Sequence, residues 1–305
     1  MSADIAVYDA RQTAELLSFP QLVASLRSAC LQYAAGEILA PERQVVPFPQ
    51  GGVMLSMPAT AHDIAIHKLV NVVASNRELA LPTIHGVVSA FDGLTGRALF
   101  VLDGPTVTAR RTAAVSILGL QTFLSATPLS VALLGTGAQA AGHMDALAAI
   151  FPGLIVHVVG TSAAKAQAFA HAHRHLPLET HPADTVPETV DAVITLTTSA
   201  VPVYTNAARN GVLVIGVGAY KPELAEIAPA TLHASRLYVD DMAGAHHEAG
   251  DFIQAKVDWA RVTALSTALA NGVAFDKPIV FKTVGCAAWD LAAARCALDA
   301  LRRLP

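Results

Sequence analysis

Charged residues and cysteines are scarce in this chain of 305 residues, and no long apolar run is present. Charged residues make up 14% of the sequence and hydrophobic residues 53%, with a formal net charge of −4. Without a basic cluster the chain offers little to a nucleic-acid backbone. Its apolar stretches are interrupted well before the roughly 18 residues of a membrane span, and its N-terminus lacks the pattern of a signal peptide. We therefore expect no nucleic-acid partner, no membrane partner and a cytoplasmic location.

Metal-binding patterns are also missing. The three cysteines, Cys30, Cys286 and Cys296, lack metal-ligand spacing, and an odd number argues against a disulfide framework. The alternating histidines between His171 and His175 would not share one face of a helix. We expect buried thiols and no metal. The large hydrophobic fraction exceeds what one compact monomer needs to bury, which favours a subunit interface in a homodimer.

A glycine-rich turn is the most informative motif present. A short apolar run at Ser130–Leu134 leads into Gly135-x-Gly137-x-x-Ala140 and then a helical segment. In this arrangement the first glycine allows the tight turn, the second lets the backbone approach phosphates, and the small third residue lets helix and strand pack closely. A second apolar run at Leu154–Val159 and a helical run from Ala163 to His173 complete a βαβ unit. The pattern predicts a site for a nicotinamide dinucleotide.

The residues after the second strand bear on which dinucleotide binds. Sites specific for NAD usually place an Asp or Glu there for the ribose 2′-hydroxyl, but this sequence has Gly160-Thr161-Ser162. Thr161, Ser162 and Lys165 can donate hydrogen bonds to a 2′-phosphate. The sequence therefore favours NADPH, with NADH as the alternative because the arginine that often clamps this phosphate is also missing.

The order of the remaining segments predicts an α/β protein of two domains. A helix over Thr13–Ala35 precedes short β-like runs between residues 44 and 103, which indicate a largely antiparallel sheet. We expect a mixed α+β substrate-binding and dimerisation domain over residues 1–120, completed by 279–305, and a Rossmann-type dinucleotide-binding domain over 121–278. In this division the run Ile279–Val284 and the final helix return to the first domain.

Three cations in the first half lie beside small or apolar neighbours. Arg43, Lys68 and Arg111 would together suit a carboxylate substrate, because Arg offers a planar fork and Lys a compact charge. Taken singly, each is also explained as a surface or ion-pairing residue. Asp290, early in the last predicted helix, is either a support for such a site or a simple charge at a helix N-terminus.

Several strings, taken in order, resemble the ornithine cyclodeaminase/mu-crystallin family over nearly the whole chain. The most specific is Thr108-Ala109-Arg110-Arg111-Thr112-Ala113-Ala114 coupled to the Gly-x-Gly-x-Gln of residues 135–139. The others are Leu81-Pro82-Thr83, Phe91-Asp92, Thr95-Gly96 and Lys282-Thr283-Val284-Gly285.

The resemblance implies roles for individual residues. Arg43, Lys68 and Arg111 correspond to the substrate-carboxylate cluster, with Met54 in the lining and Lys68 as a candidate catalytic proton donor. Solvent is the other source of that proton. The resemblance also places Thr83, Thr112, Ala138, Gln139, Thr161, Ser162, Thr197, Val217 and Gly285 near the dinucleotide. Further predicted contacts are Gly135, Gly137, Lys165, Arg111 and His85, although a hydrogen-bonded core histidine also explains His85.

Two departures from the family bear on the reaction. Ornithine cyclodeaminases of this family carry a Glu in the strand after the first Arg and an Asp before a Cys-Pro turn. Here those positions hold Met54 and Tyr220. A thioether cannot take a proton, so cyclisation of ornithine is disfavoured, whereas reduction of a preformed cyclic imine needs no such base.

The resemblance is nearest to the branch that reduces the cyclic imines delta-1-pyrroline-2-carboxylate and delta-1-piperideine-2-carboxylate. That branch transfers hydride from NAD(P)H to the imine carbon, giving proline or pipecolate. The alternatives are an ornithine cyclodeaminase or amino-acid dehydrogenase of the same family, and a non-catalytic binder of small molecules.

Overall fold

The computed structural model describes residues 5–303, which form two compact units. One unit contains the residues up to Arg111 together with those from Cys286 onward, and the other is Thr112–Gly285. The chain thus changes unit inside helix α3 (Gly104–Phe123) and again just before helix α10 (Ala287–Arg303). The sequence placed these two changes after residue 120 and after residue 278.

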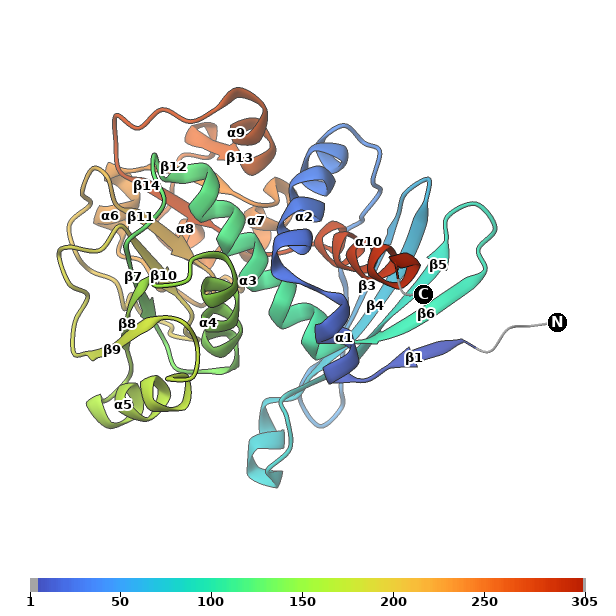
Figure 1. Ribbon diagram of the computed structural model, residues 1–305. Helices are drawn as coiled ribbons and strands as arrows, with labels where there is room; N and C mark the ends of the chain where they lie inside the picture. Colours follow the sequence, from blue (N-terminus) through green and yellow to red (C-terminus); the bar gives the residue numbers. More distant parts are fainter. Residues whose placement is uncertain (1–4, 304–305) are drawn as a thin grey trace. The chain divides into compact units, whose positions relative to one another are not determined.

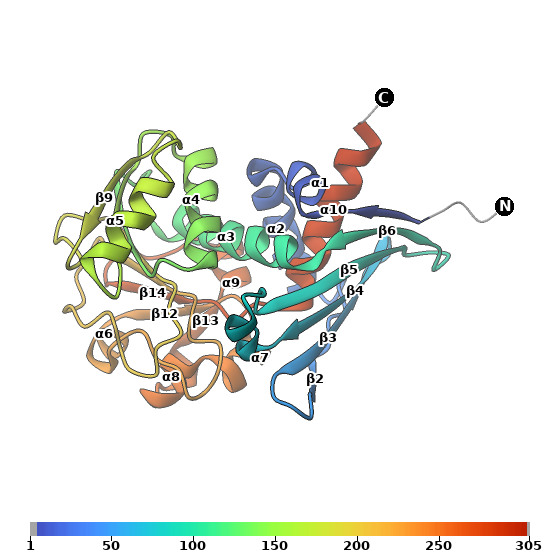
Figure 2. The same ribbon diagram turned by 90° about the horizontal axis from the view of Figure 1, so that it is seen from below.

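A six-stranded sheet forms the first unit, in the order β1-β6-β5-β4-β3-β2 (Figure 2). Strand β1 is parallel to β6 and the other neighbours are antiparallel, which confirms the largely antiparallel sheet expected from the sequence. The strands are β1 (Ala6–Tyr8), β2 (Gln44–Pro47), β3 (Val53–Thr60), β4 (Ile64–Val72), β5 (Ile84–Asp92) and β6 (Ala98–Asp103), with the 3-10 helix η1 (Ala74–Leu79) between β4 and β5.

Alternation along β4 decides which side chains face the core of this unit. Ile64, Ile66 and Val70 are buried on the face against which α10 packs (Figure 1), while the residues between them are half-buried on the other face. Lys68 has the same parity as the three apolar residues and is 2% exposed. The strand therefore carries a lysine into the core, beneath α10.

The first helical segment is two helices, α1 (Ala10–Leu16) and α2 (Phe19–Ala34), rather than the single helix predicted over Thr13–Ala35. Pro20 explains the break, because proline fits the first turn of a helix but disrupts an interior turn. Helix α2 packs on α10 within the unit.

An eight-stranded, wholly parallel sheet forms the second unit, in the order β13-β12-β14-β11-β10-β7-β8-β9. Such a sheet with flanking helices is the Rossmann-type arrangement predicted by the glycine motif. The strands are β7 (Ser130–Leu134), β8 (Ile155–Val159), β9 (Glu179–Ala183), β10 (Ala192–Thr195), β11 (Leu213–Gly216), β12 (Arg236–Val239), β13 (Val262–Ala264) and β14 (Ile279–Lys282).

The helices of the second unit connect these strands. Besides the second part of α3 they are α4 (Ala138–Ile150), α5 (Ala163–Ala172), α6 (Pro229–Ala234), α7 (Met242–Glu248), α8 (Gly250–Gln254), the 3-10 helix η2 (Trp259–Arg261) and α9 (Leu265–Asn271).

Strand β14 corrects one assignment made from the sequence. Ile279–Val284 was expected to return to the first domain, but β14 lies between β11 and β12 in the parallel sheet. All four of its residues are buried, as expected for a strand covered on both faces. Phe281 packs against Phe123 of α3, with ring centroids 5.1 Å apart, and a Cβ on Gly119 would lie 2.7 Å from the Phe281 ring. Only the helix after β14 joins the first unit.

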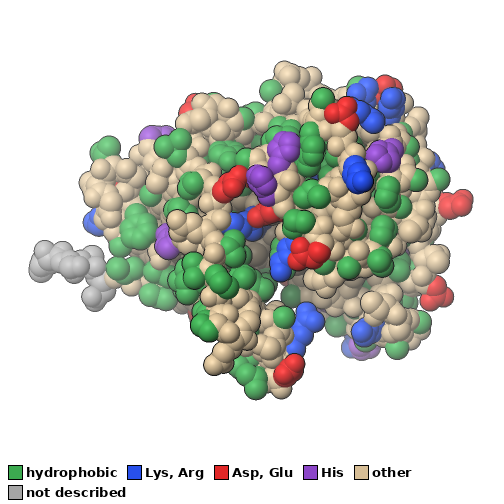
Figure 3. Space-filling view, turned by 180° about the vertical axis from the view of Figure 1, so that it is seen from behind, with side chains coloured by type: hydrophobic (Ala, Val, Ile, Leu, Met, Phe, Trp, Pro, Cys, Tyr) green, Lys and Arg blue, Asp and Glu red, His purple; other side chains and the backbone are tan. Residues whose placement is uncertain are grey.

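No helix within residues 5–303 is long and apolar enough to cross a membrane. The three cysteines are free and buried, as expected. Across the same residues, no group of three His, Cys, Asp or Glu side chains is arranged to hold a metal ion. On the face shown in Figure 3, Lys and Arg side chains lie singly or beside acidic ones.

Candidate active site

A buried carboxylate shared by two cations forms the polar centre of the first unit. Asp290, in the first turn of α10, is fully buried. Its Oδ2 lies 2.7 Å from Lys68 Nζ, and its Oδ1 lies 3.3 Å from Arg111 Nε. Lys68 and Arg111 are themselves buried, so two positive charges face one negative charge away from water. An excess of buried positive charge at this point suits an anionic ligand.

The cluster changes the acidity of its lysine. Burial lowers the pKa of Lys68 from 10.5 to about 8; the charge of Asp290 opposes this shift, and those of Arg111 and Arg43 add to it. Arg43, half-buried just before β2, therefore lies close enough to act on Lys68. The three cations predicted to form a carboxylate site thus belong to one electrostatic cluster, with Asp290 as its acid.

Two other predicted site residues point away from this cluster. On β3 the register partner of Lys68 is Met57, whereas Met54 is opposite Asn71, which in turn is opposite His85 on β5. Because side chains alternate between faces, Met54 and His85 lie on the sheet face opposite Lys68. The structure does not bring either residue into the cluster, and their binding roles stay predictions.

The glycine turn of the second unit fits a dinucleotide pyrophosphate. Gly135 has a φ of 126°, and a Cβ there would lie 2.7 Å from the carbonyl oxygen of Leu196. A Cβ on Gly137 would meet nothing within 4 Å, so space is open at the N-terminus of α4. No side chain caps that helix, which leaves its first backbone N–H groups available to an anion. Gln139 beside them has a buried Oε1 atom that accepts no hydrogen bond.

The residues predicted to select the cofactor lie together after β8. Ser162 is the N-cap of α5 and accepts a hydrogen bond from Lys165 N. Lys165 Nζ donates to Thr161 Oγ1 at 3.1 Å. These three exposed side chains form one polar group with no carboxylate among residues 160–162.

The remaining predicted contacts of the second unit lie at the carboxyl ends of its strands, where open α/β sheets bind ligands. Thr197 follows β10, Val217 follows β11, and Gly285 follows β14. Gly285 N donates to Asp240 Oδ2 at 2.9 Å, and Thr197 donates to the buried Glu226. Neither acid was predicted from the sequence.

Thr83 and Thr112 belong to different units. Thr83 lies in the first unit, where its carbonyl accepts a hydrogen bond from Val73 N at 2.9 Å. Thr112 is the first residue of the second unit, inside α3. Their contacts with a dinucleotide stay predictions.

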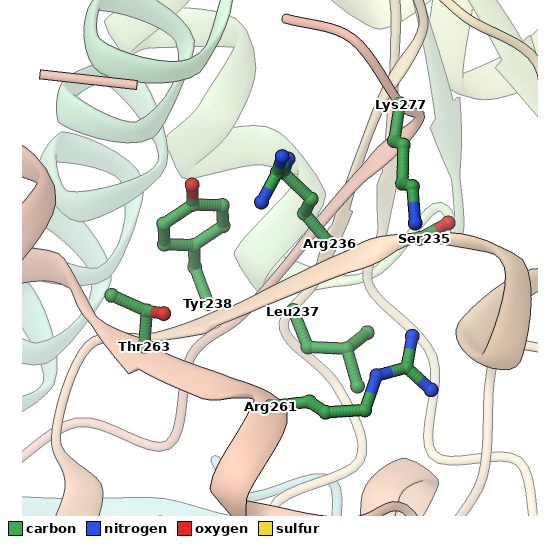
Figure 4. A pocket seen from close by; sticks show the side chains of 7 residues that line it. All are labelled: Ser235, Arg236, Leu237, Tyr238, Arg261, Thr263 and Lys277. Carbon is green, nitrogen blue, oxygen red and sulfur yellow. The ribbon is translucent and has the colours of Figure 1, made fainter. Parts of the chain in front are cut away.

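A pocket of about 210 Å³ lies in the second unit at the start of β12 (Figure 4). Arg236, one of the three basic residues that line it, is held by Asp276 through two hydrogen bonds of 2.8 Å. None of the predicted site residues lines it, and it lies at the amino ends of the strands, away from the ligand-binding edge of such sheets. We assign it no function. The lining consists of Ser235, Arg236, Leu237, Tyr238, Arg261, Thr263 and Lys277.

Comparison with known proteins settles the family. The sequence matches the ornithine cyclodeaminase/mu-crystallin family over residues 4–303. The chain belongs to this family. It is 55% identical to the Burkholderia ambifaria protein named Delta(1)-pyrroline-2-carboxylate reductase 2, and 56% identical to the Delta(1)-pyrroline-2-carboxylate/Delta(1)-piperideine-2-carboxylate reductase of Azospirillum brasilense. Each match covers 97% of this chain and 96% of the relative.

Solved structures confirm the fold. A Thermococcus litoralis Delta(1)-pyrroline-2-carboxylate reductase, solved with NADH and L-proline, matches with a TM-score of 0.88 over 98% of both chains at 23% identity. The family and the α/β fold predicted from the sequence are both confirmed.

The lowered pKa of Lys68 makes stability depend on pH in one window. Between about pH 8 and 10.5 the unfolded chain keeps the lysine proton that the folded protein has lost. Because the unfolded state then binds more protons, the free energy of unfolding rises with pH by up to about 3 kcal/mol from this residue. Urea unfolding of the wild type and of Lys68→Met should show this rise only in the wild type. If the free energy of unfolding changes with pH in the same way in both proteins, the lowered pKa of Lys68 is contradicted.

Proposed function

We propose that this protein is an NAD(P)H-dependent reductase that converts delta-1-pyrroline-2-carboxylate to proline and delta-1-piperideine-2-carboxylate to pipecolate. The observation that carries the proposal is the buried pairing of Lys68 and Arg111 on Asp290. The chain that carries this pairing is 55% identical to a protein named as a reductase of the first substrate. It is 56% identical to a protein named as a reductase of both substrates. Turnover distinguishes this proposal from a non-catalytic binder.

The cations of the cluster hold the substrate carboxylate. Arg111 and Arg43 supply planar guanidinium groups, which match a carboxylate with two parallel hydrogen bonds. Before the substrate binds, Asp290 offsets the repulsion between Arg111 and Lys68, since it pairs with both. Holding the carboxylate fixes the adjacent ring carbon, which is the carbon that accepts hydride.

Lys68 supplies the proton for the imine nitrogen. With its pKa lowered to about 8, the ammonium group is largely protonated at neutral pH and more acidic than an ordinary lysine. Protonation prevents negative charge from building up on nitrogen as the carbon is reduced. The bound dinucleotide supplies the hydride.

Met54 and Tyr220 support imine reduction over cyclisation of ornithine. The first is a half-buried thioether on β3, and the second is 36% exposed. Neither provides the carboxylate that the family's cyclodeaminases carry at these positions. A substrate that is already a cyclic imine needs no such group.

NADPH is the proposed cofactor, with NADH as the weaker alternative. The support is the group formed by Thr161, Ser162 and Lys165, which offers hydrogen-bond donors and one positive charge. A 2′-phosphate would accept from these donors and meet no carboxylate in residues 160–162. A cytoplasmic location, expected from the sequence, is part of the same proposal.

One face of the sheet in the first unit carries partly exposed apolar side chains that suit a second copy of the chain. Leu69 lies in a cross-strand row with Ser56 and Val87 on the face opposite α10, and Val87 is 41% exposed. Phe91 and Val101 share that face by register and are half-buried. An exposed apolar face of this kind marks an interaction surface. We assign it to a homodimer interface.

The activity is tested by the loss of NAD(P)H absorbance with each cyclic imine. We expect rapid oxidation with at least one imine, faster with NADPH than with NADH, and no reduction of NAD(P)+ with ornithine. Ammonia release from ornithine would favour the cyclodeaminase. Absence of turnover with both imines, from protein that binds the dinucleotide, would favour a binding protein.

The dimer is tested by sedimentation of Val87→Lys. A charge beside Leu69 on this face is costly to bury in an interface, so we expect the variant to sediment as a monomer at concentrations where the wild type is a dimer. Leu94→Lys is the matched control, because Leu94 is 90% exposed in the turn between β5 and β6. A monomeric wild type at micromolar concentration, or a dimeric Val87→Lys, would refute this interface.

A further inference from the structure

Glu226 is a fully buried acid in the segment between β11 and α6, and its carboxylate accepts five hydrogen bonds. Oε1 accepts from Thr197 N at 2.5 Å and from Thr197 Oγ1 at 2.9 Å. Oε2 accepts from Thr195 Oγ1 at 2.9 Å, Gly218 N at 2.6 Å and Ala219 N at 3.1 Å. One side chain thus ties together the chain segments that follow two neighbouring strands.

Those two segments lie at the carboxyl ends of β10 and β11, the edge at which this kind of sheet binds ligands. They are packed tightly: a Cβ on Gly218 would lie only 1.9 Å from the carbonyl oxygen of Thr197. The loop after β10 also borders the glycine turn, since a Cβ on Gly135 would lie 2.7 Å from Leu196 O. A shift of the Glu226 side chain would therefore move the loops at the edge where the dinucleotide is expected to bind.

A second layer of buried charge holds Glu226 itself in place. Asp251 Oδ1 accepts from the backbone N–H groups of Glu226 at 2.6 Å and Ile227 at 2.8 Å. Asp251 Oδ2 lies 3.5 Å from Lys282 Nζ, which donates to the carbonyl of Gly216 at the end of β11. The two hydrogen bonds to Asp251 hold the backbone at Glu226, and the five hydrogen bonds that its carboxylate accepts hold the side chain.

The arrangement cannot be reproduced by an amide. Each Glu226 oxygen faces at least one backbone N–H, that of Thr197 on one side and those of Gly218 and Ala219 on the other. In Glu226→Gln one of the two positions becomes an NH2 group, which would oppose a donor in either orientation. The substitution keeps the size of the side chain but forces one of the two loops away.

We propose that Glu226 is a positioning residue that sets the loops after β10 and β11 for the nicotinamide half of the bound cofactor. The proposal rests on the proposed use of a nicotinamide dinucleotide. It concerns one half only, because the order of strands is β11-β10-β7-β8 and the loop after β8, with Thr161 and Ser162, lies on the other side of β7. That loop is the one that the glycine motif assigns to the adenosine ribose.

The test compares affinity for the whole cofactor with affinity for the fragment that lacks nicotinamide. NADPH is paired with 2′-phospho-ADP-ribose, and NADH with ADP-ribose, in calorimetric titrations of the wild type, Glu226→Gln and Asp191→Asn. The matched control, Asp191, also accepts backbone N–H bonds, from Leu129 at 2.7 Å and Ser130 at 3.0 Å, but at the amino end of β7. In Glu226→Gln we expect whole-cofactor affinity to fall about tenfold or more, with fragment affinity within about twofold of wild type.

If Glu226 has only a structural role, Glu226→Gln should weaken binding of the whole cofactor and of the fragment equally, or should weaken neither. Either result overturns the proposal. The proposal is also overturned if Asp191→Asn loses affinity for the whole cofactor alone, to the same extent as Glu226→Gln. If Glu226→Gln does not fold, Thr195→Val removes a single donor and must show a smaller loss in the same selective sense. A wild type that binds neither cofactor nor fragment would instead refute the proposed dinucleotide function.

Discussion

The Asp290 carboxylate, shared between Lys68 and Arg111, is the constraint on which the first unit depends. Two cations taken out of water repel each other. The buried Asp290 carboxylate between them offsets this repulsion and leaves one positive charge in excess. Burial lowers the pKa of Lys68 to about 8, and the positive charges of Arg111 and Arg43 add to this shift. Strand β4, helix α3 and helix α10 each supply one member, so the cluster joins three elements that lie far apart in the sequence.

The second unit uses buried carboxylates in another way, as acceptors for backbone N–H groups at the carboxyl ends of parallel strands. Asp240 accepts from Val284 and Gly285, and Glu226 accepts from the loops after β10 and β11. Loops that would otherwise be free to move are fixed where a ligand is expected. The glycine turn needs no such support, since Gly135 N donates to the carbonyl of Val159 at 2.9 Å and α4 offers its uncapped N-terminus directly.

Local patterns in the sequence were sufficient to predict the glycine turn, most strands and the family, because each of these depends on residues near one another in the chain. Pro20 also carried a local signal, and the single helix predicted across it was wrong. Strand β14 could not be placed, since four buried residues fit any covered strand and only tertiary packing on α3 decides the sheet. Met54 and Lys68 were grouped without a register, although the parity of β3 against β4 separates them. The roles of Asp290 and Glu226 could not be predicted, because their partners are distant in the sequence. The one local signal of a buried acid was that each lies in a segment of otherwise small or apolar residues.

Proton donation by Lys68 is tested most directly by the pH dependence of kcat/KM for imine reduction by the wild type and by Lys68→Met. We expect the wild type to lose activity above about pH 8, because the buried ammonium group then loses its proton. Lys68→Met should be about a hundredfold or more less active and should lack that decline. Near-normal reduction by Lys68→Met, with the same decline above pH 8, would show that solvent supplies the proton and that the cluster only binds the substrate.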